Sequence, residues 1–144
     1  MKIVLLLLTL FVFANAQTPY TLAHYKSVYP VVEIFTDKVP VKYKQEILKI
    51  MKEYTSEMKI NTEGFSDRAL GIIVTRVAVG ETLILKVELL VGEDVKRLDD
   101  GEETFALTYQ KIDIIEVDNL HEDLIDSVEY LLEEFKEQYI EDNE

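Results

Sequence analysis

The sequence predicts an α+β fold, a two-layer sandwich in which an antiparallel three-stranded meander and one further strand form a sheet, with two amphipathic helices packed on one face. Three observations predict it: two segments with apolar residues at helical spacing, three consecutive β-rich segments, and glycine-containing turns that separate those three. The expected order is β-α-β-β-β-α, within one domain that spans residues 29–140.

The chain before and within the first strand changes character at Tyr29. Residues 17–28 contain Pro19 and follow no period, so we expect an irregular lead-in there. Residues 29–36 are rich in β-branched and aromatic side chains and predict a strand. Pro30 stands near its start, where a missing backbone donor costs least. The neighbour and the direction of this strand stay open.

The first helix is expected to begin after Pro40 and to end near Met58. Its apolar residues recur every three or four positions, which places them on one face that a sheet can cover. These residues are Tyr43, Ile47, Met51, Tyr54 and Met58. Residues 61–67 include Gly64 and several polar turn formers, so the chain is expected to change direction there.

The segments 69–79 and 82–91 are predicted to form a hairpin around Gly80-Glu81. Glycine at the first central position suits a two-residue type II′ turn, which makes residue 79 face residue 82 and fixes every later pair. One face is then almost entirely apolar. Its predicted pairs are Ala78 with Leu83, Arg76 with Leu85, Val74 with Val87, Ile72 with Leu89, and Leu70 with Val91.

The third strand of the meander is expected over residues 105–117, after a turn at 99–102. With Asp100-Gly101 at the centre of a tight turn, the predicted pairs are Ile112 with Leu89, Ile114 with Val87, and Glu116 with Leu85. The apolar residues near the hairpin tip are one step out of phase with this register. We therefore expect a bulge near Gln110-Lys111.

The last segment predicts a long amphipathic helix. Asn119 and Glu122 have the spacing of a capping box, and apolar residues recur at helical spacing from Leu120 to Tyr139. Its outer face is almost purely acidic. Because acids near the C-terminus oppose the helix dipole, residues 141–144 are expected to be a frayed acidic tail.

The first sixteen residues, 1–16, have the pattern of a cleaved signal peptide: Lys2, an apolar run, and small residues before a cut between Ala16 and Gln17. The expected localisation is the periplasm or the extracellular space. The chain has no cysteine, so a lipoprotein anchor and disulfides are excluded on chemical grounds. No stable membrane anchor is expected after cleavage.

The charge of the mature chain limits its partners. Removal of Lys2 leaves 15 − 1 = 14 basic against 28 acidic residues, a net charge of 14 − 28 = −14. A field of this sign repels phosphate backbones and anionic headgroups, so nucleic acid is not an expected partner. Acidity of this kind more commonly serves solubility than recognition of a cation.

No catalytic, cofactor or metal constellation emerges from the sequence. The histidines, His24 and His121, are about a hundred residues apart, which is a poor start for zinc, and the serines lie in no nucleophile elbow. The acidic stretch at 93–103 could bind calcium, but it lacks the spacing of an EF-hand, and a solvated turn is favoured. We expect no enzyme activity and no cofactor.

Arg76 breaks the pattern of the apolar hairpin face. In the predicted register Glu116 lies in the same row across the sheet, with Leu85 between them. One interpretation is a partly buried structural ion pair between Arg76 and Glu116. The other is that Arg76 extends to water at the end of the strand.

The opposite face of the predicted meander also carries apolar residues, and the two helices would leave it uncovered. Uncovered apolar surface on an exported domain is typical of a partner or ligand surface. The candidate residues are Ile73, Val77, Val79, Ile84 and Leu90. The alternative is that the lead-in, with Tyr20, Tyr25 and Tyr29, folds across this face.

Three function classes follow from these features. The first is a non-enzymatic protein-interaction or envelope-accessory module that binds another envelope protein through its sheet face or a sheet edge. The second is a carrier of a small apolar ligand in a cavity between helices and sheet; the third and least favoured is a hydrolase-type enzyme. In the order of its elements the chain resembles small α+β modules of bacterial envelope assembly, such as the N-terminal domain of the Tol-system propeller protein. That resemblance implies an interaction role and assigns no site residues.

Overall fold

The computed structural model describes residues 21–144, and it has the predicted order of elements. Strand β1 (Tyr29–Phe35) is followed by helix α2 (Tyr43–Glu57), then by strands β2 (Arg68–Val79), β3 (Thr82–Lys96) and β4 (Glu103–Glu116), and last by helix α3 (Leu120–Asn143). The expected signal peptide and its cleavage position at Ala16 and Gln17 lie outside the described residues.

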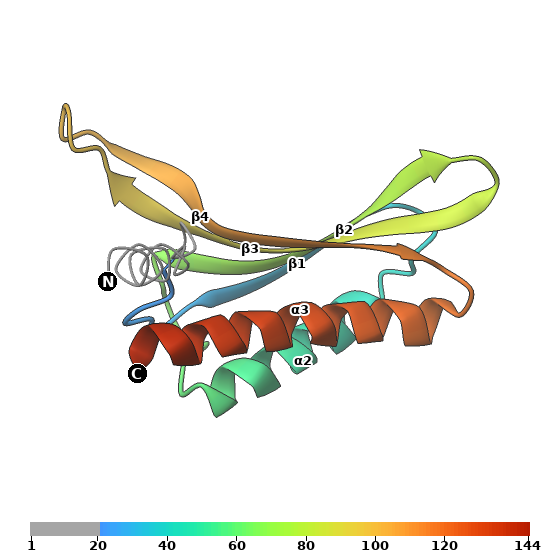
Figure 1. Cartoon of the computed structure of the whole chain (residues 1–144), viewed down its shortest axis with the longest axis horizontal. Helices are drawn as coiled ribbons and strands as arrows, with labels where there is room; N and C mark the ends of the chain where they lie inside the picture. Colours follow the sequence, from blue (N-terminus) through green and yellow to red (C-terminus); the bar gives the residue numbers. More distant parts are fainter. Residues whose placement is uncertain (1–20) are drawn as a thin grey trace, which may run out of the picture.

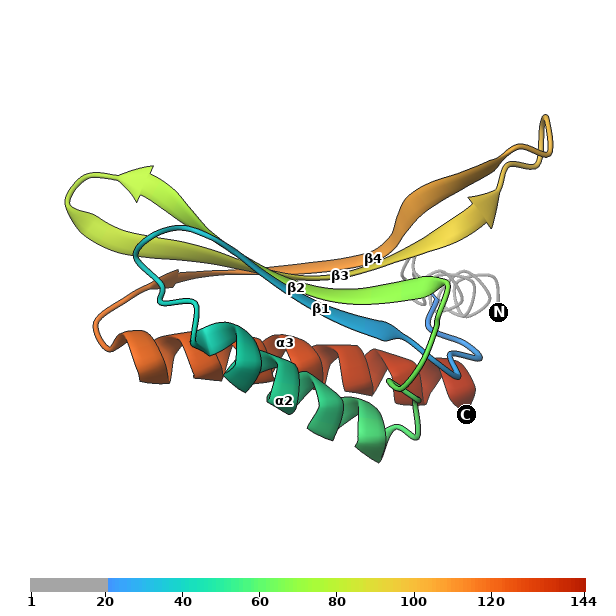
Figure 2. The same cartoon turned by 180° about the vertical axis from the view of Figure 1, so that it is seen from behind.

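The molecule has two layers, one of strands and one of helices. Figures 1 and 2, taken from opposite sides, both show α2 and α3 on the same side of the sheet. We call the side that carries the helices the inner face and the other side the outer face. Both views also show the β2–β3 and β3–β4 hairpins rising away from the helices at opposite ends of the sheet. The α+β sandwich predicted from the sequence is therefore confirmed.

The first strand, whose place the sequence left open, lies at one edge of the sheet. The four strands follow the order β1-β2-β3-β4, and β1 runs parallel to β2, with Val32 opposite Ile72. A parallel neighbour requires a crossover, and α2 provides it. Strand β4 forms the other edge.

The β2–β3 hairpin has the predicted register. Val79 lies opposite Thr82, and the pairs continue through Val74 with Val87 to Arg68 with Glu93. Gly80 has a φ of +59°, whereas Glu81 is not among the residues with positive φ. A type II′ turn needs positive φ at its first central residue alone, so glycine at position 80 explains both the turn and the register.

The predicted register between β3 and β4 is wrong by one residue. Leu89 pairs with Lys111 and Val87 with Asp113, so Ile112 and Ile114 point to the outer face instead of the core. The connecting loop is wider than a two-residue turn, because the N–H of Arg97 bonds to the carbonyl of Glu102.

The irregularity in this strand pair lies slightly nearer the hairpin tip than expected. Val91 pairs with Tyr109 but Gly92 pairs with Leu107, which leaves Thr108 as the extra residue of a bulge. The bulge therefore lies at Thr108 and not at Gln110-Lys111. It turns Tyr109 into the core and keeps Phe105 and Leu107 on the outer face.

The core fills the space between the inner face and the helices. From the sheet it takes Leu70, Ile72, Val74, Leu85, Val87, Leu89, Val91 and Tyr109, and from the helices Ile47, Met51, Leu124, Val128, Leu131, Leu132 and Phe135. The rings of Tyr109 and Phe135 meet edge to face, with 5.3 Å between their centroids. Because these aromatic rings are fully buried, the bulge at Thr108 is held in place by packing.

The lead-in, as far as it is described, is irregular but packed. Leu22, Tyr25 and Val28 are buried in the core. The N–H of Leu22 donates to Asp142 over 2.6 Å, and the N–H of His24 donates to Asn143 over 2.9 Å.

Helix α3 continues to Asn143, through residues that the sequence predicts to fray. The unfavourable position of acids at the end of a helix is offset because Asp142 and Asn143 bond to the lead-in. Sequence periodicity ends at Tyr139 and could not reveal these two contacts.

Candidate interaction surface

The outer face consists of the alternate residues of all four strands that point away from the helices. The pairing places three rows across its centre. They are Phe35-Thr75-Lys86-Ile114, Glu33-Ile73-Glu88-Ile112 and Val31-Gly71-Leu90-Gln110. Since α2 and α3 both lie on the inner side, no helix within residues 21–144 covers this face.

The outer face carries apolar residues at both edges, and at its centre Ile73 and Leu90 lie beside the charged pair of Lys86 and Glu88. Phe35 on β1 is 66% exposed and Ile114 on β4 is 63% exposed. Further exposed apolar side chains on this face are Tyr29, Val79, Phe105, Leu107 and Ile112. An uncovered apolar surface that crosses a whole sheet is typical of a binding surface.

The predicted patch lies on this face. Ile73, Val77, Ile84 and Leu90 are partly buried by their neighbours in the sheet, and Val79 is exposed near the hairpin turn. Two exposed residues of β4, Ile112 and Ile114, were missed because the predicted register had turned them inward. The signal that could have found them was present: a bulge at Thr108 brings Phe105, Leu107, Ile112 and Ile114 onto one face.

The lead-in does not cover the outer face in the described part of the chain. The hydroxyl of Tyr25 donates to Glu93, which lies on the inner side, and Tyr25 is part of the core. Tyr29 belongs to β1 and points outward as part of the face itself. Tyr20 lies outside the described residues.

Two glycines flatten this face. A Cβ on Gly92 would lie 2.3 Å from the ring of Phe105, and a Cβ on Gly71 would lie 3.1 Å from Leu90. Phe105 and Leu90 therefore lean over the glycines of neighbouring strands. The result is a smoother surface than alternating large side chains would give.

The charges near the centre of the outer face are compensated. Lys86 pairs with Glu88 at 2.7 Å, and Gln110 donates to Glu88 at 3.0 Å. The amino group of Lys44 lies 2.7 Å from Glu33. Because Lys44 belongs to α2 and Glu33 points outward, this pair crosses the edge of β1 and obstructs the addition of another strand there.

Exposed acidic groups line helix α3. The exposed acids along α3 are Glu122, Asp126, Glu129, Glu137 and Glu141. Between α3 and β4 an open groove is lined by Asp113, Glu116, Asp123 and Asp126, together with Ile115, Ser127 and Tyr130. Helix α3 and the β4 edge are therefore strongly anionic, in contrast to the centre of the outer face.

The ion pair predicted between Arg76 and Glu116 is absent among the contacts of residues 21–144. Arg76 pairs with Leu85, as predicted, and lies on the inner side of the sheet. Glu116 pairs with Ile84 and points outward. The one-residue shift of β4 moved Glu116 to the other face, and Arg76 is exposed near the end of its strand, as the second interpretation expected.

The acidic stretch at 93–103 is divided between two structural roles. Glu93 binds Arg68, with 2.5 Å between Oε2 and Nε, and accepts from Thr108 at 2.7 Å. At the tip, Arg97 pairs with Asp100. In the described part of the chain no group of three His, Asp or Glu side chains is arranged to hold a metal ion.

The histidines lie at opposite ends of α3. His121 stands in its first turn, 3.8 Å from Glu46, and the backbone of His24 is bonded to Asn143 in its last turn. At about 1.5 Å per residue these helix ends are about 33 Å apart. The two histidines are therefore too far apart to act together.

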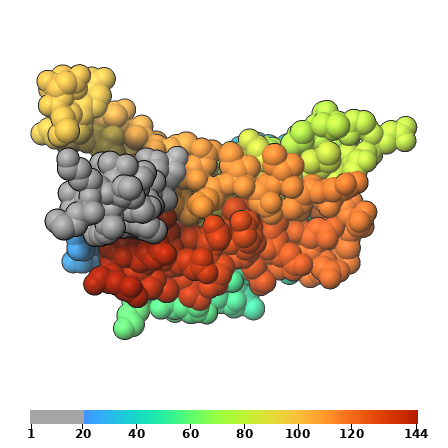
Figure 3. All heavy atoms as spheres, in the orientation of Figure 1, coloured from blue at the N-terminus to red at the C-terminus, as the bar shows by residue number. Residues whose placement is uncertain are grey.

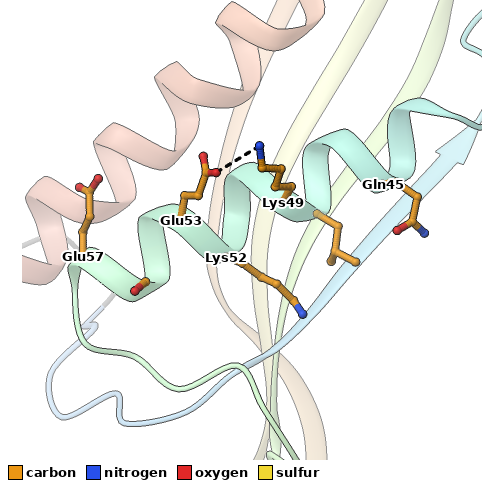
Figure 4. Close-up of a pocket in the computed structure, with 7 residues that line it drawn as sticks. Gln45, Lys49, Lys52, Glu53 and Glu57 are labelled. Carbon is orange, nitrogen blue, oxygen red and sulfur yellow. Dashed lines mark ion pairs between the residues drawn. The ribbon is translucent and has the colours of Figure 1, made fainter.

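The grooves beside α2 are open depressions on the surface. Figure 4 shows Gln45, Lys49, Lys52, Glu53 and Glu57 along a single helix, with Lys49 paired to Glu53. A second groove, lined by Tyr29, Pro30, Val31, Val32, Lys44, Gln45 and Leu48, continues along the edge of β1. Their lysines are bound by neighbouring carboxylates, Lys44 by Glu33 and Lys52 by Glu63.

Burial raises the pKa of several tyrosine hydroxyls. For Tyr109 the loss of hydration is the main cause, and the nearby Glu134 and Asp142 add to it. Burial also raises the pKa of Tyr25, and the charge of Glu93 contributes. These hydroxyls remain protonated at neutral pH and serve the packing of the inner side.

No helix within residues 21–144 has the length and apolar character needed to cross a membrane. We found no match to the chain among protein-family models, curated proteins or solved structures.

Proposed function

We propose that this protein is an exported, non-enzymatic interaction module that binds a partner protein on its outer sheet face. One observation carries the proposal: the outer face presents Phe35, Ile112 and Ile114 to solvent, although burial of such side chains would contribute about 25 cal/mol per Å². A partner that covers this face recovers that free energy.

The arrangement of charges supports the same surface. A protein partner must remove both apolar and polar groups from water, and unpaired charges make that costly. The ion pairs of Lys86 with Glu88 and of Lys44 with Glu33 lower this cost at the outer face. Helix α3, with its excess of acids, serves solubility and repels other anionic surfaces.

Photo-crosslinking in the source cells tests the proposal. A photoreactive phenylalanine analogue at Phe35 or Ile112 is expected to give a defined protein adduct, and the same analogue at the exposed Tyr130 on α3 serves as the control. Equal adducts at all three positions, or none at Phe35 and Ile112, would contradict the proposal.

Export is tested separately by the N-terminus of the protein recovered from those cells. If the signal peptide is removed as proposed, the chain begins at Gln17. Recovery of a chain that still begins at Met1 would contradict export by cleavage.

A further inference from the structure

We infer that the partner on the outer face is a second copy of this chain, packed face to face so that two sheets lie between two outer layers of helices. This inference rests on the proposed function, because it uses the same surface. It adds the identity of the partner and the geometry of the complex.

The charge distribution favours this face for self-association. Two copies joined through α3, or through the β4 edges, would bring like charges together, since acids line α3 and the groove between α3 and β4. Two copies joined through their outer faces bring together surfaces whose central charges are already paired. Their acidic α3 helices then lie on opposite sides of the dimer, which keeps these like charges apart.

The edges of the sheet support the same choice. At β1 the ion pair between Lys44 and Glu33 crosses the strand edge. At β4 the acidic groove adjoins the strand. Extension of the sheet by a second copy is therefore obstructed at the β1 edge and opposed by like charges at the β4 edge. The outer face remains as the surface on which a second copy can bind.

The size of the face is that of a stable interface. Alternate positions of four strands supply roughly twenty residues, which is the number that each partner contributes to a standard interface of about 1,600 Å² in total. Its apolar residues lie at both edges, Phe35 on β1 and Ile114 on β4, and the charged residues between them, Lys86 and Glu88, are paired with each other.

The curvature of the sheet indicates how the two copies are oriented. The hairpins rise from both ends of the outer face, and the space-filling view shows them above the central part of the sheet (Figure 3). Two twisted sheets, each concave along its strands, fit together when the strands of one cross those of the other near 90°, as in orthogonal sheet packing.

The dimensions agree with that orientation. Four strands spaced about 4.8 Å apart occupy about 19 Å, and the section in which all four strands lie side by side follows the 7 residues of β1, about 23 Å at about 3.3 Å per residue. The sheet of one copy therefore fits between the two raised hairpins of the other.

Sedimentation equilibrium of the mature chain and two matched variants tests the dimer. Ile114→Glu adds a charge to an exposed residue of the outer face, and Tyr130→Glu adds the same charge to an exposed residue of α3. We expect the native chain and Tyr130→Glu to dimerise with similar affinity, and Ile114→Glu to weaken dimerisation at least tenfold. Phe35→Glu, at the opposite edge of the face, is expected to act like Ile114→Glu.

The absence of cysteine from the chain allows a direct test of geometry. A spin label on a single cysteine at Thr75, at the centre of the face, is expected to give a short distance between copies, because packed sheets lie about 10 Å apart. A label at Ser56 on α2 is expected to give a much longer distance. A dimer with the reverse order of distances would overturn the face-to-face arrangement.

A chain that is monomeric at all concentrations, or a dimer that Ile114→Glu leaves intact, would also overturn the inference. A separate result tests the proposed function. If the native chain is monomeric and Phe35 or Ile112 crosslinks to a different protein, the face remains a binding surface and only its occupant changes.

Discussion

A single carboxylate joins three separate parts of this molecule. Glu93 is only partly exposed and binds Arg68 from the start of β2, Thr108 from the bulge of β4 and Tyr25 from the lead-in. The guanidinium of Arg68 also lies over the ring of Tyr25, 4.5 Å from its centroid. Sequence patterns could not reveal this cluster, because its members are up to 83 positions apart (108 − 25 = 83) and depend on where the bulge occurs.

We expect Glu93→Gln to lower the free energy of unfolding by about 1.5–3 kcal/mol, since it removes a charged acceptor shared by three donors. Urea unfolding followed by circular dichroism measures the change. Glu81→Gln, in the exposed hairpin turn, is the matched control and should be neutral. Equal stability of the two variants would show that the cluster contributes little.

The buried tyrosines predict a loss of stability at alkaline pH. The pKa of Tyr109 is raised in the folded state by burial, whereas a tyrosine in the unfolded chain titrates near its ordinary value of about 10. The stabilisation is complete below that value. Above it the unfolded state releases a proton that the folded state retains, so the free energy of unfolding falls.

Tyr109→Phe removes the titrating hydroxyl and should make the loss above pH ~10 less steep, although Tyr25 still contributes. Unfolding by urea at a series of pH values in both chains measures the two slopes. Identical slopes would mean that Tyr109 titrates normally in the fold.

The register of a strand pair could be predicted where a two-residue turn joins the strands, and not where a longer loop does. The two-residue turn at Gly80-Glu81 fixes β2 against β3 by local chemistry, so every predicted pair there is confirmed. The wider loop after Lys96 and the bulge at Thr108 together shift β4 by one residue from the register of a two-residue turn, and the bulge places Tyr109 against Phe135. The phase of the apolar residues indicates a bulge, but it does not reveal that Tyr109 packs against Phe135, so β4 was predicted one residue out of register.

The same one-residue error limited the prediction of the surface. The central residues Ile73, Ile84 and Leu90 were assigned to the outer face correctly because they belong to the well-defined hairpin. Ile112 and Ile114 were assigned to the core, where Lys111 and Asp113 stand instead. These polar residues are accommodated by partners on α3, Glu134 for Lys111 and Ser127 for Asp113.

The start of α3 was predicted by its cap, but the reciprocal partner was not. The side chain of Asn119 accepts from the N–H of Glu122, as expected of a capping box. The backbone N–H groups of Asp118 and Asn119 donate to Asp123, both at 2.8 Å, and not to Glu122. We expect Asp123→Ala to lower the free energy of unfolding by about 1 kcal/mol, and Glu122→Ala by less, measured by urea unfolding. The reverse order would assign the reciprocal role to Glu122.

The last turn of α3 stabilises the lead-in. Asp142→Ala and Asn143→Ala remove the acceptors of the Leu22 and His24 amides, and each should cost about 1 kcal/mol. Amide hydrogen exchange should become faster at Leu22 and His24 and stay unchanged at Val87. Glu141→Ala, an exposed neighbour, is the control. Unchanged exchange in both variants would contradict this role.

At the scale of the whole molecule, the excess negative charge opposes folding and association alike. Raising the ionic strength from about 0.01 M to about 0.15 M shortens the screening length from about 30 Å to about 8 Å. We therefore expect the melting temperature at pH 7 and fixed protein concentration to rise with salt. Near pH 4, where many carboxylates are protonated, the rise should be much smaller. An equal rise at both pH values would point to a cause other than charge repulsion.

The bonds between Leu22 and Asp142 bring the beginning of the described chain next to its end. The order in which the elements are connected is therefore not essential to this architecture. A circular permutant that joins Glu144 to Thr21 by a short linker and opens the chain at Asp99-Asp100 would keep all four strands and both helices whole. Such a rearranged gene should encode the same sandwich, with its new ends at the tip of a hairpin.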